Sequence, residues 1–186
     1  GYDIEMGYRK KIGGVNFGIN ANISYLENKV TFLGNGRKFL DGGATIQSAA
    51  FPITRVEVGQ PFNAFYGFET NGIFQNEAEV TNYVSSNGTI IQPLARPGDF
   101  KWKDIDGNGL IDSNDRTFIG SPIPDFTYGM TINLDYKNFD LTVFAQGVTG
   151  NQIFQGVRRL DVANSNYQTV AMGRWTGEGT SNTFPR

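Results

Sequence analysis

Apolar and polar side chains alternate through four stretches of this chain, and the alternation limits the fold more than any other feature. The stretches are residues 2–9, 15–25, 128–137 and 139–146. A period of two over such lengths predicts β-strands with one apolar and one polar face. We therefore expect a mainly β fold with antiparallel strands. Phe144 breaks the pattern, because it falls on the polar face of the last stretch.

Two short connections join these stretches into hairpins. Gly13-Gly14 separates the first pair and Lys137-Asn138 separates the second. A two-residue turn fixes the register of a hairpin, so Ile12 is expected opposite Val15, and Tyr136 opposite Phe139 in the second hairpin. Both registers bring the apolar side chains of the paired strands onto one common face.

The dimensions of the strands suit a bilayer. Each strand carries an apolar band of about ten residues, which crosses a membrane when the strand is tilted, and Tyr or Phe flanks the ends of the bands. Short turns alternate with a long excursion, residues 26–127. Outer-membrane barrels have this arrangement, with long loops on the extracellular side. A soluble β-sandwich stays open as the alternative, because its half-buried strands alternate in the same way.

The composition excludes several function classes. The 186 residues include no cysteine and no histidine, which removes disulfides, the commonest general base and the usual zinc ligand. A net charge of −2 gives no basic field for nucleic acid. The glutamates show no spacing that singles out a glycosidase pair. We therefore predict that the protein is not an enzyme.

Residues 104–115 have the spacing of a calcium loop. Counted from Asp104, oxygen-bearing side chains stand at positions 1, 3, 5, 9 and 12, glycine stands at position 6 and an apolar residue at position 8. The expected Ca²⁺ ligands are the carbonyl of Leu110 and the side chains of Asp104, Asp106, Asn108, Asp112 and Asp115. Because Asp115 is shorter than the usual glutamate, we expect a structural or weak ion rather than a signalling switch. A solvated turn without metal would select similar residues.

Aromatic residues gather within the long excursion. Phe62, Phe65, Tyr66 and Phe68 are candidate substrate-binding residues that would stack on a sugar; the alternative is that they form a local core with Phe74. A short capped helix is expected at 76–83, because acidic side chains stand in its first turn. Residues 167–174 are expected to form a short helix or a loop.

Several motifs along the sequence resemble the C-terminal barrel region of SusC/RagA-type TonB-dependent outer-membrane transporters. The motifs are Gly59-Gln-Pro-Phe-Asn-Ala-Phe-Tyr-Gly-Phe68, Gly72-Ile-Phe-Gln75, Pro97-Gly-Asp-Phe-Lys-Trp-Lys-Asp-Ile-Asp-Gly-Asn-Gly-Leu-Ile-Asp112, Arg116-Thr-Phe-Ile-Gly-Ser-Pro-Ile-Pro-Asp-Phe-Thr-Tyr-Gly129, Arg174-Trp-Thr176 and Pro185-Arg186. The resemblance covers nearly the whole sequence, and the run from residue 97 to 129 is its most specific part.

The resemblance implies a large barrel with an internal plug, in the outer membrane of a Gram-negative, Bacteroidetes-like cell. It also implies uptake of glycans or peptides, driven by the TonB complex, with a SusD-like surface lipoprotein as a cap. Outer-membrane lipid would surround the barrel, and the calcium-type loop would lie in an extracellular loop. The plug, the TonB box and most barrel strands of this family are not in the sequence.

These implications give an expected division of the molecule. Residues 1–25 form a barrel hairpin, 26–127 an extracellular-loop region, 128–150 a second barrel hairpin, and 151–186 a loop or short helix that stops before the barrel closes. The isolated fragment is expected to be an open or self-associated sheet. A second function class is a secreted, calcium-binding β module that binds a glycan or a protein, whose apolar strand faces would pack inside.

Overall fold

The computed structural model describes residues 1–34, 36–42, 51–156 and 166–186. The protein divides into two compact units. Unit 1 comprises Gly1–Leu40, Val56–Ala64 and Gly120–Ile153, and unit 2 comprises Asp41–Arg55, Phe65–Ile119 and Phe154–Arg186. Among the residues that the structure describes, no helix is long and apolar enough to cross a membrane.

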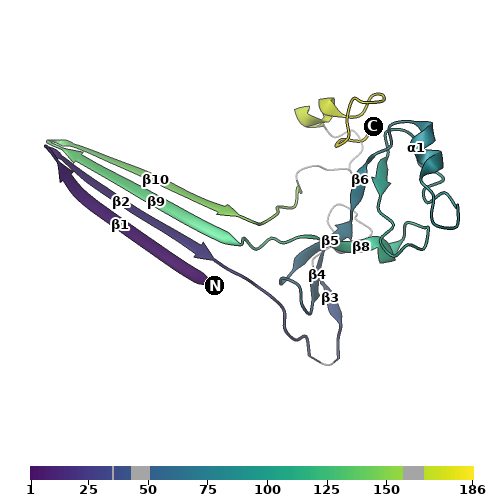
Figure 1. Cartoon of the computed structure of the whole chain (residues 1–186), viewed down its shortest axis with the longest axis horizontal. Coiled ribbons are helices and arrows are strands. Elements are labelled where there is room, and N and C mark those ends of the chain that lie inside the picture. Colours follow the sequence, from purple (N-terminus) through teal and green to yellow (C-terminus); the bar gives the residue numbers. More distant parts are fainter. Residues whose placement is uncertain (35, 43–50, 157–165) are drawn as a thin grey trace. The chain divides into compact units, whose positions relative to one another are not determined.

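Four long strands of unit 1 form one antiparallel sheet (Figure 1). They are β1 (Tyr2–Ile12), β2 (Val15–Tyr25), β9 (Phe126–Tyr136) and β10 (Phe139–Thr149), of 11 residues each, in the order β1-β2-β9-β10. This confirms both predicted hairpins. The two tight turns lie at the same end of the sheet. Within the described residues the sheet is open, with β1 and β10 at its edges.

The register brings the apolar residues of the four strands to common levels. The rows on this face are Tyr2–Tyr25–Phe126–Thr149, Ile4–Ile23–Tyr128–Gly147, Met6–Ala21–Met130–Ala145, Tyr8–Ile19–Ile132–Val143, Lys10–Phe17–Leu134–Leu141 and Ile12–Val15–Tyr136–Phe139. The last row contains both predicted pairings across the turns, which are therefore confirmed. Aromatic side chains stand in the first and the last row, so the apolar face has an aromatic rim at each end.

The apolar face is exposed. Tyr2 is 74% exposed and Phe139 is 78% exposed, and most of the apolar residues of both edge strands are also accessible. A sandwich would bury these side chains, so their exposure favours the barrel prediction. The opposite face carries Asn, Gln, Thr, Ser, Gly and charged residues, except that Phe144 and Val148 lie there, opposite Thr131 and Thr127.

The two tight turns use left-handed backbone. Gly13 has φ 61° and Lys137 has φ 52°, as the favoured two-residue hairpin turns require. Glycine adopts this conformation freely, whereas lysine does so at a steric cost. The ammonium group of Lys137 lies 5.2 Å from the centre of the Tyr136 ring.

The long connection between β2 and β9 forms smaller elements. One sheet has the order β3-β4-β5-β8, and β6 pairs with β7 in another. Their bounds are β3 (Phe39–Gly42), β4 (Thr54–Glu57), β5 (Ala64–Phe68), β6 (Thr70–Ile73), β7 (Phe100–Trp102) and β8 (Arg116–Gly120). The helices of this connection are α1 (Glu77–Asn82) and η1 (Ser113–Asp115), and η2 (Thr169–Gly173) follows β10.

The helix predicted at 76–83 is present as α1. Asn76 caps it, because its side-chain oxygen accepts a hydrogen bond from the Glu79 amide at 3.0 Å. The carboxylate of Glu79 in turn accepts from the amide of Gln75 at 3.0 Å. Reciprocal bonds of this kind satisfy amides that a helix start leaves without partners. Val80, on the inner face of α1, is buried.

The core of unit 2 is small. Phe74 is fully buried, and Ile73, Val80 and Ile91 are also buried. The ring of Tyr83 packs edge-on against Phe74, with 5.8 Å between ring centres. Phe74 therefore has the core position that was one of the two alternatives expected for the aromatic residues.

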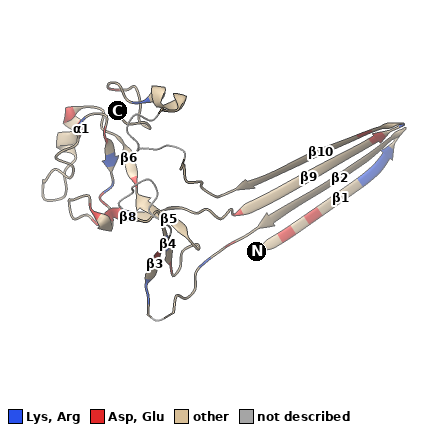
Figure 2. Ribbon diagram, turned by 180° about the vertical axis from the view of Figure 1, so that it is seen from behind, with Lys and Arg blue, Asp and Glu red and all other residues tan. Residues whose placement is uncertain are grey.

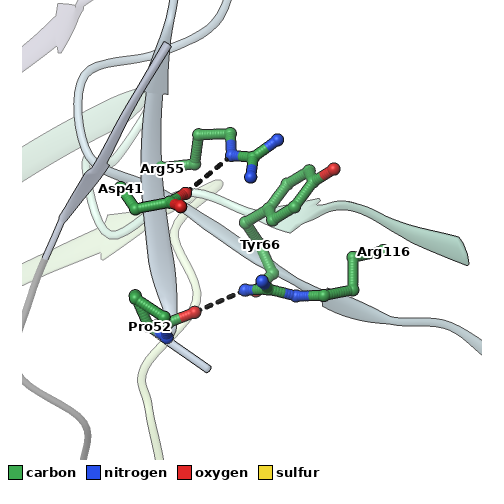
Figure 3. A network of polar contacts seen from close by, with 5 residues as sticks. All are labelled: Asp41, Pro52, Arg55, Tyr66 and Arg116. Atoms are coloured by element: carbon green, nitrogen blue, oxygen red, sulfur yellow. Dashed lines mark hydrogen bonds and ion pairs between the residues drawn. The ribbon is translucent and has the colours of Figure 1, made fainter. Parts of the chain in front are cut away.

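A buried arginine joins several segments of unit 2 (Figure 3). Arg116 is 7% exposed and donates hydrogen bonds to the carbonyls of Pro52 and Tyr66. Its guanidinium group lies 4.8 Å from the centre of the Tyr66 ring. Arg55 lies 3.8 Å from the centre of the same ring and pairs with Asp41 at 2.9 Å. The Tyr66 ring is thus held by two arginines.

Candidate metal centre

Two glycines shape the calcium-type loop, which connects β7 to η1 and β8. Gly107 has φ 74° and Gly109 has φ 86°, in the left-handed region that favours glycine. A Cβ atom at Gly109 would lie 2.9 Å from the Cβ of Ser85. Position 6 of the loop therefore needs glycine both for its backbone angle and for its close approach to Ser85.

The first acidic residues turn their side chains into the loop. Asp104 accepts hydrogen bonds from the amide of Gly107 at 2.8 Å and from the amide of Gly109 at 2.9 Å. Asp106 accepts from the amide of Asn108 at 3.0 Å. The side-chain oxygen of Asn108 accepts from the next but one amide, that of Leu110, at 2.7 Å. These bonds hold the oxygens of positions 1, 3 and 5 within one tight turn.

Asp115, at position 12, closes the loop. Its side chain is fully buried, and its two oxygens accept from the amides of Ile105 and Asp112, each at 2.7 Å. Asp112 accepts from the amide of Asn114 at 2.7 Å and so caps η1. The short helix η1 thus brings the buried carboxylate back to the start of the loop.

Three carboxylates converge in this loop. Asp104, Asp106 and Asp115 each place one oxygen within 4.8 Å of the other two. Three negative charges at such distances repel one another, and a hard cation bound by oxygens would offset the repulsion. Asn108 lies beside them, whereas Asp112 serves mainly as a helix cap, and the side chain of Leu110 is 59% exposed. The arrangement can hold a calcium ion through three carboxylates of the predicted set.

Tyr83 lies beside the loop. Burial raises the pKa of its phenol above the ordinary value, and the nearby charges of Asp104 and Asp115 act in the same direction, opposed by a hydrogen bond with the backbone of Asp104. The phenol is therefore protonated near neutral pH and donates to the carbonyl of Trp102 at 2.5 Å. Sequence reasoning missed Tyr83, because nothing in the spacing connects it with a loop that starts 21 positions later.

The predicted sugar-stacking residues do not share one environment. Phe62 belongs to unit 1, is 56% exposed, and its amide donates to Asn28 at 2.7 Å. Phe65, Tyr66 and Phe68 belong to unit 2 and are half-buried. The ring of Phe68 packs against the rings of Phe51 and Trp102. The rings of Tyr66 and Phe68 therefore have packing partners within unit 2.

Three curated relatives are similar in sequence to most of the protein. TonB-dependent receptor P3 of Formosa agariphila is 31% identical over 166 residues, which are 89% of this chain and 16% of the receptor. TonB-dependent receptor P26 of the same organism is 29% identical over 72% of this chain and 13% of the receptor. TonB-dependent receptor SusC of Bacteroides thetaiotaomicron is 23% identical over 89% of this chain and 14% of the receptor. The sequence thus spans only about a seventh of the length of these relatives.

A solved structure shares the fold. The RagAB peptide importer in its "open-open" state matches with a TM-score of 0.54 and 20% identity, over 80% of this chain and 14% of that chain. A comparison with models of protein families found no match.

Proposed function

The chain belongs to the SusC/RagA family of TonB-dependent receptors, of which it spans one segment, and from this premise we propose that it forms part of the wall of an outer-membrane importer. The four long strands contribute to the barrel. Their apolar face contacts lipid, and their polar face lines the lumen. The connection between β2 and β9 lies on the extracellular side.

The register of the long sheet supports this proposal most strongly. Each strand has 11 residues; at about 3.3 Å per residue and a tilt of about 45° such a strand rises about 25 Å, the height of the apolar band of outer-membrane barrels. The aromatic rims stand at both ends of this band, where interfacial aromatic girdles are expected. One continuous apolar face with two aromatic rims is what a lipid-facing wall requires.

The charged residues of β1 are compatible with a strand that spans the apolar band. Figure 2 shows basic residues of β1 at the end next to the turn and acidic residues near its start. Lys10 is the one charged residue in the apolar rows, and it stands one row from the turn. A lysine there can extend its ammonium group to the interface while its stem stays in the apolar region.

The family also supplies candidate partners and substrates. We propose that energy comes from the TonB complex and that a SusD-like lipoprotein covers the extracellular side. The relatives support this, because they are TonB-dependent receptors by name and include SusC and the RagAB peptide importer. The substrate class is a glycan or a peptide.

The topology can be tested in cells that express the full-length protein. Leu94 is 92% exposed in the long connection, and Asn138 lies in a tight turn. We expect a membrane-impermeant maleimide added to intact cells to label a Leu94→Cys variant and not an Asn138→Cys variant, while both are labelled after lysis. Labelling of Asn138→Cys but not of Leu94→Cys on intact cells would reverse the orientation, and recovery of the protein outside the outer-membrane fraction would refute the proposal.

We also propose that the loop at 104–115 binds Ca²⁺ as a structural ion. The convergent oxygens of Asp104, Asp106 and Asp115 and the two left-handed glycines support this. A ligand that binds only the folded state stabilises it, by about 2.7 kcal/mol at a hundred times its dissociation constant. The ion would thus fix the start of β8 relative to β7.

Terbium provides a direct test, because Trp102 stands two residues before the first ligand and can transfer excitation to a bound Tb³⁺. We expect sensitised Tb³⁺ emission that Ca²⁺ competes away and that an Asp104→Asn, Asp106→Asn variant loses. An Asp140→Asn variant on β10 is the control and should keep the emission. Equal emission from all three proteins would leave the loop as a turn without metal.

A further inference from the structure

Three Asn-Gly steps lie within the described residues, at Asn71, Asn87 and Asn108. Asparagine before glycine is prone to deamidation, because glycine has no side chain to keep its amide nitrogen away from the asparagine Cγ. The reaction needs a free side-chain amide and a free glycine N–H. The structure treats the side-chain amides of the three steps differently.

The steps at Asn87 and Asn108 are held by hydrogen bonds. Asn87 accepts from the hydroxyl of Ser85 at 2.6 Å and from the amide of Thr89 at 3.0 Å, and the amide of Gly88 donates to the Ser85 carbonyl at 2.9 Å. Asn108 accepts from the amide of Leu110 and donates to Asp106 at 3.0 Å. The amide of Gly109 donates to Asp104. In both steps, ring closure must first break hydrogen bonds of the asparagine side chain and of the glycine amide.

Asn71 is in a different position. Its side chain is exposed and makes no hydrogen bond with any residue that the structure describes. β6 pairs with β7 at Thr70 and at Ile73, and the register shifts between these two pairs. Asn71 and Gly72 therefore form a bulge, where the regular ladder is interrupted. Gly72 has φ 93°, a backbone conformation open to glycine.

We infer that Asn71 is a deamidation site of this protein and reacts before Asn87 and Asn108. The Gly72 nitrogen loses its proton to solvent base and attacks Cγ of Asn71, so a new bond joins these two atoms. The bond between Cγ and Nδ2 of Asn71 then breaks, and ammonia leaves. Water opens the succinimide at either carbonyl and gives aspartate or isoaspartate. No further reactant is needed.

Deamidation of Asn71 would change the charge and the backbone of β6. The bulge lies opposite Lys101, between the paired residues Phe100 and Trp102, and the ammonium group of Lys101 lies 4.9 Å from the centre of the Tyr83 ring. A carboxylate at position 71 adds a negative charge to β6 on the stretch that faces Lys101 of β7. An isoaspartate adds a backbone atom to the strand that leads to the buried Ile73.

The test compares each site in the folded protein with the same site in the unfolded protein. The full-length protein is incubated at mildly alkaline pH with and without urea, and tandem mass spectrometry of its peptides gives a rate for each asparagine. We expect folding to slow Asn87 and Asn108 at least about tenfold, because two or more hydrogen bonds must break, and to slow Asn71 only a few-fold. Asn71→Gln removes the fast modification, whereas the matched Asn87→Gln does not.

A folded protein in which Asn87 or Asn108 reacts first would overturn the inference. So would equal protection of all three sites. The readout does not depend on transport or on calcium, so it stands apart from the proposed function.

Discussion

Outside the core of unit 2, substitution of Gln75 should reduce the local stability of this unit the most. Its side chain makes four hydrogen bonds: Nε2 donates to the carbonyls of Ile73 and Ser181 at 2.9 and 3.0 Å, and Oε1 accepts from the Trp175 indole and the Gly179 amide at 3.2 and 2.9 Å. Three of its partners lie about a hundred positions later in the sequence. Gln75→Ala removes three of the hydrogen bonds that link residues 73–76 with 175–182, while those of Ile73 with Asn182 and of Asn76 with Glu178 remain.

The expected size of the effect follows from these bonds. Each contributes about 1 kcal/mol net, and the bond to Gly179 is exposed, so we expect a loss of about 2–4 kcal/mol in the local stability of this segment. Hydrogen exchange in the full-length protein measures this quantity, because local opening sets the exchange rate. Amides of 175–186 should exchange faster by a factor of about 30 to 1,000.

Gln168 provides the matched control. Among the described residues, its side chain accepts one long bond, 3.3 Å, from Gln155 at the surface. Gln168→Ala should therefore leave exchange in 175–186 within about twofold, corresponding to a few tenths of a kcal/mol. If Gln75→Ala changed exchange no more than this control, the assignment of the link to Gln75 would be wrong.

Two further predictions use matched pairs of positions with positive φ. Gly98→Ala should be less stable than Gly88→Ala by about 1–3 kcal/mol in chemical unfolding, because a Cβ at Gly98 would lie 2.5 Å from the Trp175 ring, whereas Gly88 has no atom within 4 Å; equal losses would contradict this. Gly13→Ala should cost about 1 kcal/mol, while Lys137→Gly should be neutral or slightly stabilising, as melting temperatures of the two variants would show; a clear loss for Lys137→Gly would contradict this.

Much of the long sheet could be predicted, because its strand faces and hairpin registers depend on residues that are close together in the sequence. Alternation with a period of two defines the faces, and a two-residue turn leaves one register, so the pairing of Ile12 with Val15 follows from adjacent residues. The convergence of Asp104, Asp106 and Asp115 has the same origin, since these residues lie within one short segment of the sequence. The family resemblance added the expectation that both hairpins belong to one barrel, although a hundred positions separate β2 from β9.

Contacts between distant segments have no pattern in the sequence from which they could be predicted. Nothing in the sequence connects Gln75 with Trp175, or Arg116 with the carbonyl of Pro52. The aromatic residues at 62–68 looked alike in the sequence, yet Tyr66 is enclosed by arginines and Phe62 belongs to the other unit. Such differences depend on which neighbours the fold supplies, so composition could not separate a stacking surface from packing.

The claim that the long sheet is a lipid-facing wall can be tested most directly at two adjacent residues of β9. Met130 lies in the apolar rows, and Thr131 lies on the opposite face. Tryptophan is introduced at each position of the full-length protein in bilayers that contain brominated lipid, and the added emission is compared with that of the parent protein. Strong quenching is expected for Met130→Trp and little for Thr131→Trp. Equal quenching, or stronger quenching of Thr131→Trp, would contradict it.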